Sequence, residues 1–398
     1  MSKWKLAAAL AVTAVTASFL TLAVILFTVD GLTASRAPAA NGAVAQKVSQ
    51  IEELIKTYFV NEYDTETVGD YAADAMIEAL DDPWSYYIPA SDADAVDEQI
   101  SNSYCGVGAN VYENDDGQFE ITYITEGSPA EAAGLLVGDV IVRVDGQGVD
   151  DMTLDEVVAL VRGEEGTPVT LSVLRGDQTL ELPMKRGSIR LTIVSGGMQE
   201  GEIGYILIDN FDEDAYSQFS RVLRELLSDG AKGLIFDVRF NPGGMQDQLV
   251  PILDTLLPEG VIFRCTDYDG TETVNQSDSA CVELPMAVLI NADSASAAEF
   301  FAAAMQEYDR AVIVGEKTGG KGDFQYIFEL DDGSAVALSA GKYYTPSGKS
   351  LSGVGVQPDI AVKMSDEQIY KLYYGYLEDA DDPQLQAAIK SISERISK

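Results

Sequence analysis

The sequence predicts a multidomain α/β protein behind an N-terminal transmembrane helix, and three observations lead to this prediction. An uncharged run of 24 residues lies near the start of the chain. Short strands and turns with one helix follow in the middle, and strands then alternate with helices over 187–364. Such alternation is typical of a layered α/β core. With 398 residues, the chain is long enough for two or three domains.

The candidate membrane anchor is the segment over residues 1–30. Lys3 and Lys5 precede Leu6–Val29, which contains no charged residue. About 20 apolar residues span a bilayer, whereas the apolar core of a cleavable signal peptide is shorter. We therefore predict an uncleaved, single-pass anchor in the cell membrane, with its positive end in the cytoplasm and the rest of the chain outside. Secretion after cleavage near Ala37–Ala40 is the alternative.

A linker and a helical segment follow the anchor. Residues 31–45 are rich in small residues and include a proline, as expected of a linker. Over 46–101 the pattern is helical, and a second helix is expected over Val68–Leu80, ending at the "DDP" that follows. The first helix is indicated by apolar residues at helical spacing, namely Val48, Ile51, Leu54, Ile55 and Tyr58.

The composition narrows the range of partners. The net charge is −39, from 65 acidic and 26 basic residues, and 46% of the chain is hydrophobic. Proteins that bind nucleic acid neutralise phosphates with clustered Lys and Arg, so we expect no nucleic-acid partner. Cys265 and Cys281 flank a turn-rich segment, and a disulfide between them in an oxidising compartment is left open. Cys105 is expected to be a small packing residue.

A glycine-rich stretch near the end of the α/β region could be mistaken for a nucleotide site. In Val314–Phe328, Gly315, Gly320 and Lys321 nearly reproduce the spacing of a phosphate-binding loop. That loop needs Ser or Thr after the lysine to hold magnesium, and Gly322 stands there instead. The stretch also leads into a strand rather than a helix. We therefore expect no nucleotide, and the sequence predicts neither a metal nor another cofactor.

The region over 102–186 is predicted to bind peptide ends. It opens with "YCGVG" and continues through "GSPAEAAGL" and "VGDVIVRVDG" to a helix. Backbone N–H groups around Gly106–Gly108 could form a nest for a terminal carboxylate, although an isolated turn is the alternative. The order of these motifs resembles a circularly permuted PDZ domain, which implies recognition of a polypeptide's carboxyl end. The implied binding loop consists of Tyr104, Gly106, Val107 and Gly108.

A serine at a strand-to-helix junction is the candidate nucleophile. Leu289–Met305, "LINADSASAAEFFAAAM", is expected to be a buried strand followed by a helix from Ala297, which places Ser294 and Ser296 at the tip of a sheet. Because the chain contains no histidine, histidine-based triads are excluded and the serine needs another base. The alternative for Ser296 is a helix cap, since Ser296 and Glu299 have capping-box spacing.

Lysine is the known substitute for histidine as a base. An ordinary lysine, with a pKa of about 10.4, is neutral in only about one molecule in 2,500 at pH 7, and burial in an apolar site lowers that pKa. Lys321 stands among glycines and apolar strands, whereas Lys317 is expected to be a solvated surface charge. Leu234–Gly244, "LIFDVRFNPGG", is expected to be a buried strand whose glycine amides face a developing oxyanion, with an ordinary tight turn as the alternative.

Together these motifs resemble the carboxyl-terminal processing peptidases, also called tail-specific proteases, over Ile51 to about Val362. The resemblance rests on "ALDDPWSYY", "YCGVG", "FDVRFNPGG", "LINADSASAAEFFAAAM", "GEKTGGKGDFQ" and "YYTPSGKSLSGVGVQPD", in family order. It implies a peptidase core over 187–364. The catalytic groups it implies are the nucleophile Ser296, the base Lys321, an orienting Gln325, and an oxyanion hole made by the amides of Gly243 and Ala297.

The resemblance implies a serine endopeptidase that acts on unfolded or tail-exposed proteins, and the predicted anchor would hold it at the membrane. It also implies that the helical segment over 46–101 can form a homodimer, with a packed helical support as the alternative. Two rival functions are a catalytically silent tail-binding scaffold and a serine hydrolase of non-peptide substrates. Two departures from the family pattern are Ala298, where a third serine is frequent, and Trp84, where histidine is common. The tail over 365–398 is expected to be helical and without chemistry.

Overall fold

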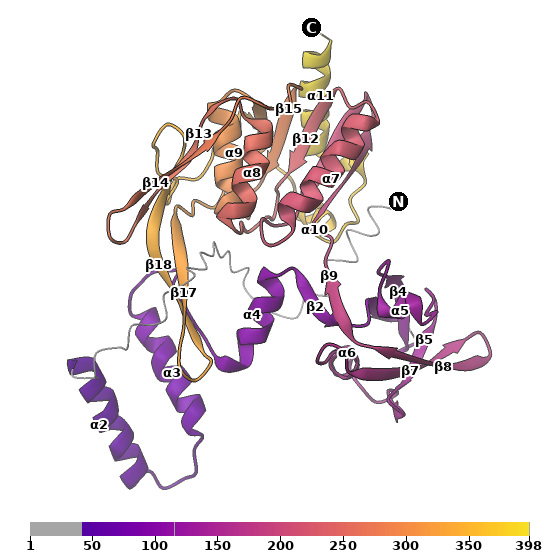
Figure 1. Cartoon of the computed structure of the whole chain (residues 1–398), viewed down its shortest axis with the longest axis vertical. Helices are drawn as coiled ribbons and strands as arrows, with labels where there is room; N and C mark the ends of the chain where they lie inside the picture. Colours follow the sequence, from indigo (N-terminus) through magenta and orange to yellow (C-terminus); the bar gives the residue numbers. More distant parts are fainter. Residues whose placement is uncertain (1–41, 115, 398) are drawn as a thin grey trace.

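The computed structural model describes residues 42–114 and 116–397 (Figure 1). The predicted anchor and most of the predicted linker lie outside these residues. Across 42–114 and 116–397, no helix is both long enough and apolar enough to cross a membrane. The account that follows therefore begins at the helical segment.

Two of the expected helices open the described chain. They are α2 (Ala43–Tyr58) and α3 (Thr65–Glu78). α3 begins before the predicted Val68 because the Asp64 side chain accepts a hydrogen bond from the N–H of Thr67 at 2.7 Å and caps the helix. The prediction of two helices is confirmed, although the second begins before Val68 and ends at Glu78 rather than Leu80.

The segment after the "DDP" turn is not wholly helical. It forms a short strand, β1 (Tyr86–Ile88), before the helix α4 (Ala93–Ile100). β1 pairs antiparallel with β18 (Ala335–Tyr344), more than 240 residues away. This pairing fixes the "DDPWS" stretch against the α/β core, which the helical prediction did not anticipate.

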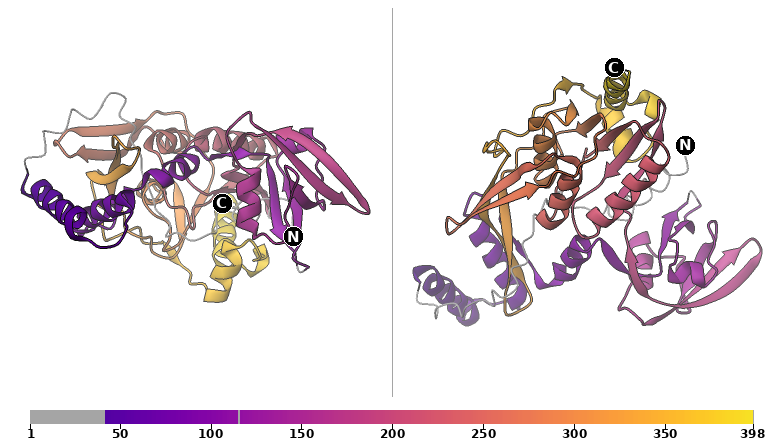
Figure 2. Two further views of the ribbon diagram at one scale, coloured as in Figure 1. Left: turned by 90° about the horizontal axis from the view of Figure 1, so that it is seen from below. Right: turned by 45° about the horizontal axis from the view of Figure 1, so that its top comes forward.

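The predicted PDZ region forms a β module with a core of its own (Figure 1, Figure 2). Its strands lie in the order β3-β4-β5-β7-β8, all antiparallel, with β6 beside β5. The elements are β3 (Ala109–Glu113), β4 (Phe119–Ile124), α5 (Pro129–Ala132), β5 (Val140–Val144), β6 (Gln147–Gly148), α6 (Leu154–Val161), β7 (Pro168–Arg175) and β8 (Gln178–Lys185).

A two-stranded ribbon connects this module to the rest of the chain (Figure 1). It consists of β2 (Ser103–Gly106) and β9 (Gly187–Arg190), which pair antiparallel. Arg162, at the end of α6, forms an ion pair of 2.8 Å with Glu98 of α4. The entry and exit of the β module therefore meet at one place, next to α4.

The core is a six-stranded sheet in the order β10-β11-β12-β15-β16-β19. β10 is antiparallel to its neighbour, and the other strands run parallel. The carboxyl ends of parallel strands meet at one edge of a sheet. The strands are β10 (Val194–Gln199), β11 (Ile203–Ile208), β12 (Gly233–Asp237), β15 (Met286–Ile290), β16 (Ala311–Gly315) and β19 (Ile360–Ala361).

Helices cover both faces of this sheet (Figure 1). One face packs against α7 (Ala215–Ser228), α8 (Gln246–Leu256) and α9 (Ala297–Glu307) in the largest hydrophobic cluster. The other face packs against α11 (Pro383–Ile396), which follows α10 (Asp366–Tyr373). The predicted helical tail is thus a structural layer of the core, and its apolar face replaces solvent over the central strands.

A second sheet extends from the core toward α3 (Figure 1). β17 (Asp323–Glu329) and β18 form a hairpin, and β18 also pairs with β1 and with β13 (Gly260–Asp267), which pairs with β14 (Glu272–Ser277). Cys265 and Cys281 are both free, as is Cys105, so the disulfide that the sequence left open is not formed. This sheet brings the start of β17 and the "DDPWS" stretch to the same edge of the core.

Candidate active site

Ser296 occupies a strained turn between β15 and α9. Its backbone has φ 58° and ψ −121°, outside the favoured regions for a residue with a side chain, and it is completely buried. Such a conformation costs on the order of 1–3 kcal/mol and persists where the surrounding structure enforces it. Ser296 is also the N-cap of α9, and its N–H donates to Glu299 at 2.9 Å as in a capping box, so the helix-cap alternative is borne out for the backbone. Within the described chain its hydroxyl has no hydrogen-bond partner, so the cap leaves the hydroxyl available for chemistry.

Ser294 has a different role from Ser296. Its hydroxyl donates a hydrogen bond to the carbonyl of Val238 at 2.8 Å and accepts one from the N–H of Asn291 at 3.0 Å. The first bond ties the turn after β15 to the segment after β12, and the second holds the turn itself. Of the two serines at the junction, only Ser296 therefore keeps a free hydroxyl for chemistry.

The glycine turn after β12 contacts Ser296 directly. A Cβ atom on Gly243 would lie 2.7 Å from Ser296 Cβ and 3.0 Å from the backbone nitrogen of Ala297, and Gly243 has φ 114°. No side chain could be accommodated at that distance, which explains the glycine. The structure thus brings together Ser296 and both amides that were predicted to form the oxyanion hole.

The two amides predicted to form the oxyanion hole, those of Ala297 and Gly243, differ in their hydrogen bonding. In the described chain the N–H of Ala297 has no hydrogen-bond acceptor, as is usual at the first position of a helix. The N–H of Gly243 donates to the side-chain oxygen of Asn241 at 2.8 Å. Asn241 is buried and also donates from its side chain to the carbonyl of Ile208 at 2.8 Å. One predicted oxyanion donor is therefore open and the other is occupied by a neighbour.

Lys321 lies in the loop between β16 and β17 and is 1% exposed. Burial lowers the pKa of Lys321 from 10.5 to about 7, against the opposing influence of Asp82, Glu299 and Asp323. A lysine with that pKa is neutral in roughly half of the molecules at pH 7. The side chain is thus available as a base, as the sequence predicted for a lysine among glycines and apolar strands.

Glu299 joins the nucleophile turn to the lysine loop, and the sequence analysis gave it no such role. Its carboxylate accepts four hydrogen bonds, which occupy both oxygens and fit an ionised group. The donors are the N–H of Ser296 at 2.9 Å, the hydroxyl of Thr318 at 2.5 Å, the N–H of Gly320 at 2.7 Å and the N–H of Lys321 at 2.7 Å. Burial raises the pKa of the Glu299 carboxyl, and these donors oppose that rise.

Gln325 is completely buried near the start of β17. Its side-chain nitrogen donates to the hydroxyl of Ser339 at 3.1 Å, and its side-chain oxygen has no hydrogen-bond partner in the described chain. The predicted contact between Gln325 and the lysine amine is therefore not formed in this arrangement. A buried oxygen without a partner is the kind of group that a functional site retains.

The "DDPWS" stretch closes over the lysine from the N-terminal side. The Lys321 amine lies 4.8 Å from the centre of the Trp84 ring. Asp82 accepts a hydrogen bond from the hydroxyl of Ser85 at 2.6 Å, and that hydroxyl accepts one from the N–H of Ser339 at 3.0 Å. Trp84, which replaces the family's common histidine, thus shields the lysine from water.

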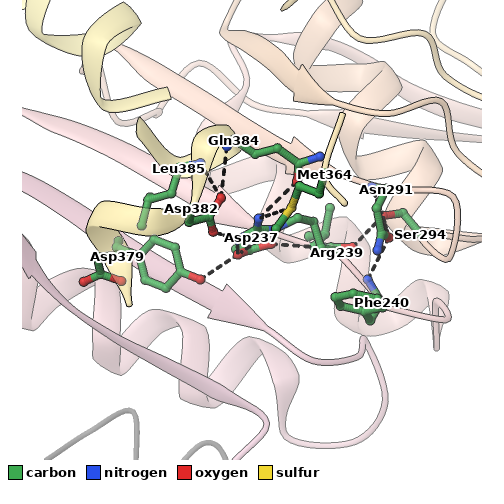
Figure 3. Close-up of polar contacts among 12 residues, drawn as sticks. Asp237, Arg239, Phe240, Asn291, Ser294, Met364, Asp379, Asp382, Gln384 and Leu385 are labelled. Atoms are coloured by element: carbon green, nitrogen blue, oxygen red, sulfur yellow. Dashed lines mark hydrogen bonds and ion pairs between the residues drawn. The ribbon is translucent and has the colours of Figure 1, made fainter. Parts of the chain in front are cut away.

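A buried ionic cluster holds the segment that leads from β12 into the Gly243 turn (Figure 3). Arg239, which follows β12, pairs with Asp237 at 2.5 Å and with Asp382 at 2.9 Å. Asp382 also caps α11 by accepting hydrogen bonds from the N–H groups of Gln384 and Leu385, each at 3.0 Å. The tail, expected to have no chemistry, therefore anchors the strand that leads into the Gly243 turn.

Comparisons with known proteins agree with this geometry. Residues 202–362 match the sequence profile of peptidase family S41, and residues 120–175 match that of the PDZ domain. The carboxy-terminal processing protease CtpA of Bacillus subtilis (strain 168) is 35% identical over 358 residues, which are 89% of this chain and 76% of that protein. The chain belongs to the carboxy-terminal processing peptidases of family S41. It is therefore a serine-type endopeptidase with a PDZ domain.

Two further relatives are similar to this S41 peptidase. A probable CtpA-like serine protease of Staphylococcus aureus (strain N315) is 32% identical over 320 residues, 79% of this chain. The chain spans 64% of the length of that relative. A solved structure of a photosystem II D1 C-terminal processing protease is 27% identical, with a TM-score of 0.47, over 85% of this chain and 92% of that chain.

The predicted PDZ loop of this S41 peptidase lies at the end of β2 and before β3. Val107 is buried in the core of the β module, and Gly108 has φ 79°. A Cβ atom on Gly108 would lie 2.3 Å from Ser128 Cβ, so only glycine fits there. In the described chain, the N–H groups of Val107 and Gly108 donate to no protein acceptor. Tyr104 lies on β2, with the guanidinium of Arg162 4.9 Å from its ring.

Proposed function

We propose that this peptidase cleaves peptide bonds with a dyad of Ser296 and Lys321. The observation that carries the proposal is the pairing, in one buried site, of a strained serine with a free hydroxyl and a lysine whose pKa is about 7. A histidine base is not available to Ser296, because the chain contains no histidine at all. A lysine that is half neutral at pH 7 supplies the missing base.

In the first half of the reaction, neutral Lys321 takes the proton of the Ser296 hydroxyl as the oxygen attacks the substrate carbonyl. The carbonyl oxygen becomes an oxyanion beside the amides of Ala297 and Gly243. Removing one oxyanion donor costs on the order of 10²–10³ in rate, so both amides matter. Without substrate, the Gly243 N–H donates to the side-chain oxygen of Asn241. Substrate binding must therefore either redirect this N–H to the oxyanion or have it donate to the oxyanion and the Asn241 oxygen together.

In the second half, the protonated lysine gives its proton to the leaving amine as the peptide bond breaks. Water then attacks the acyl-enzyme, and Lys321 accepts the water's proton before Ser296 is released with its own proton restored. Gln325 is proposed to accept a hydrogen bond from the lysine amine and so aim it at Ser296. Its partnerless side-chain oxygen supports this role.

The PDZ loop is proposed to bind the carboxyl end of an unfolded or tail-exposed protein. Two adjacent free N–H groups, on Val107 and Gly108, are suitable donors for a carboxylate, and the neighbouring strand can pair with the peptide. A peptide with an amidated carboxyl end should bind at least 10-fold more weakly than the same peptide with a free end. Equal binding of the two peptides by fluorescence anisotropy would contradict this role.

A single-pass membrane anchor over residues 1–30 remains part of the proposal, with the catalytic part outside the cytoplasm. It rests on the uncharged Leu6–Val29 and the lysines before it. Full-length chain should remain in the membrane pellet after washing at alkaline pH. Release of the chain, or an N-terminus near residue 40 by mass spectrometry, would support cleavage and secretion instead.

A homodimer through the helical segment is also proposed. α2 has no buried residue, and its apolar residues Val48, Ile51 and Leu54 are exposed, so a partner surface would bury them. Light scattering of the full-length chain in detergent should give twice the monomer mass, and Ile51→Glu should halve it. A monomeric parent chain would rule out this arrangement.

The decisive experiment compares the full-length chain with its Lys321→Ala and Lys317→Ala variants. Lys317, four residues earlier, is exposed and serves as the matched control. Each protein is incubated with an unfolded protein that ends in apolar residues, and mass spectrometry identifies new termini. We expect cleavage by the parent and the control, and a loss of at least 10³-fold in Lys321→Ala. Equal cleavage by all three would exclude Lys321 as the base, and tail binding without cleavage would favour the scaffold alternative.

A further inference from the structure

A pocket with an acidic side chain opens beside the Gly243 turn. Its walls come from the N-terminal region and from the loops at the edge of the core sheet. They include Tyr86, Val96, Ile100, Asp212, Pro242 and Gly243. Because Gly243 also contacts Ser296, this pocket adjoins the position of the scissile bond.

Asp212 is held in place by its backbone and leaves its carboxylate free. It follows Phe211, whose N–H and carbonyl bond to Gly243 and Met245 at 2.7 Å each. Asp212 is only 7% exposed, yet within the described residues no group donates a hydrogen bond to its side chain. Burial raises the pKa of Asp212 well above its ordinary value, and the nearby Asp247 and Glu213 add to that rise. Buried carboxylates normally have partners, so this one is suited to a partner that arrives with the substrate.

A second polar group in the pocket also lacks a partner. The hydroxyl of Tyr86 is buried and makes no hydrogen bond to any described residue. Val96, Ile100 and Pro242 give the pocket apolar walls, and Gln99 adds a polar side chain. Apolar walls with a carboxylate and a hydroxyl match a side chain that has a methylene stem and a cationic head.

We propose that this pocket is a subsite for a lysine or arginine side chain of the substrate, next to the scissile bond, with Asp212 as the partner of its charge. The proposal rests on the proposed function, because it places the peptide across Ser296. A basic side chain would pair with Asp212 and favour its ionised form, whereas an apolar or acidic one would leave the carboxyl without a charge partner. The net charge of −39 also favours the approach of basic peptides over acidic ones. An apolar pocket lined by Leu249, Phe263 and Phe300 next to Ala297 offers a different environment for another substrate residue.

The first test measures binding without cleavage, in the full-length Ser296→Ala variant. Fluorescent peptides carry lysine, norleucine or glutamate at one of the three positions on either side of a cleavage site. At one position, lysine should bind at least 10-fold more tightly than norleucine. Asp212→Asn should remove this preference, and Tyr86→Phe should weaken it about threefold. Asp229→Asn, which removes an exposed charge at the end of α7 and outside the pocket, should leave it unchanged.

Two results would overturn the subsite. One is the absence of a lysine or arginine preference at all six positions, and the other is a preference that survives Asp212→Asn. If the proposed Ser296–Lys321 dyad is wrong, the Lys321→Ala variant will still cleave the substrate. The subsite is tested separately, by the binding preference of the Ser296→Ala variant. Circular dichroism of each variant confirms that it is folded. If Asp212→Asn does not fold, the result with Tyr86→Phe decides instead.

Discussion

The active site contains two buried ionisable side chains, Glu299 and Lys321, and their surroundings act on their charges in opposite ways. Glu299 lies on the nucleophile helix and receives four hydrogen-bond donors for its two oxygens. Lys321 lies on the neighbouring loop, where burial outweighs the nearby carboxylates and lowers its pKa to about 7. The first group is held as a charge to fix geometry, and the second is kept close to neutral to accept a proton.

The difference shows that separate parts of the fold fix the geometry at Ser296 and set the pKa of Lys321. The turn at Ser296 packs against the Gly243 turn and is joined through Glu299 to the loop of Lys321, all within the α/β core. The lysine loop receives its cover from Trp84 and its neighbours, a segment far away in the sequence. Changes near Ser296 should therefore affect stability and activity together, whereas changes around Lys321 should act mainly through its pKa.

Replacing Lys321 with methionine should stabilise the folded protein, by about 5 kcal/mol at pH 5. The folded pKa of about 7 lies below the ordinary value of 10.5, so the unfolded chain binds more protons between these pH values. The cost of burying the lysine is therefore full below about pH 7 and disappears near pH 10.5. Chemical denaturation at pH 5 and pH 10 should show this gain at the lower pH only. A destabilised variant at pH 5 would mean that the lysine has strong compensating partners.

Glu299→Gln should have the opposite effect on stability. The amide group would face two N–H donors on one of its sides, which should cost about 3 kcal/mol in unfolding free energy and reduce kcat/KM by at least 10²-fold. Glu307→Gln, at the other end of α9, is the matched control and should keep most of the activity. Full activity in Glu299→Gln would show that this carboxylate does not position the nucleophile and the base.

Trp84→Ala should act through the lysine rather than through stability. Without the indole ring, water reaches the amine and the pKa of Lys321 rises, so activity at pH 7 should fall by about 10-fold and recover at pH 9. Trp84→Phe keeps an aromatic face and should stay close to the parent. If the acid limb of the pH–rate profile moved downward instead, attraction between the ring and the charged amine would outweigh shielding.

Ser339→Ala should have the smallest effect of this series. It removes the hydroxyl that holds the side-chain nitrogen of Gln325 at 3.1 Å, while the backbone of β18 stays in place. We expect kcat to fall about threefold with KM unchanged, because Gln325 is less well aimed. A larger change in KM than in kcat would place Ser339 in substrate binding instead.

The sequence was sufficient to predict the groups that local pattern controls. The strand-to-helix turn at Ser296, the glycine turn at Gly243 and the lysine among glycines each depend on residues within one short stretch. The same holds for the two N-terminal helices, whose apolar spacing and capping residue are local. Fold class and family followed from the order of these stretches.

What the sequence could not predict depends on contacts between distant segments. From the sequence alone Glu299 is a capping residue, and its hydrogen bond with the Lys321 loop exists only in the folded chain. The strand β1 is too short to be recognised without its partner β18, and the tail gives no sign that Asp382 will pair with Arg239. The hydrogen bond from Gly243 to Asn241 is likewise a property of the folded turn.

The pH dependence of Ser296 acylation tests the central claim most directly. A fluorophosphonate probe labels an activated serine without requiring the PDZ domain to bind a tail, so its rate reports on the nucleophile and base alone. For the parent chain we expect the labelling rate to rise with pH through a limb near pH 7, and Lys321→Ala to be at least 10³-fold slower with no such limb. A parent rate that is flat between about pH 6 and 9, or equal labelling of Lys321→Ala, would contradict the lysine as the base of this peptidase.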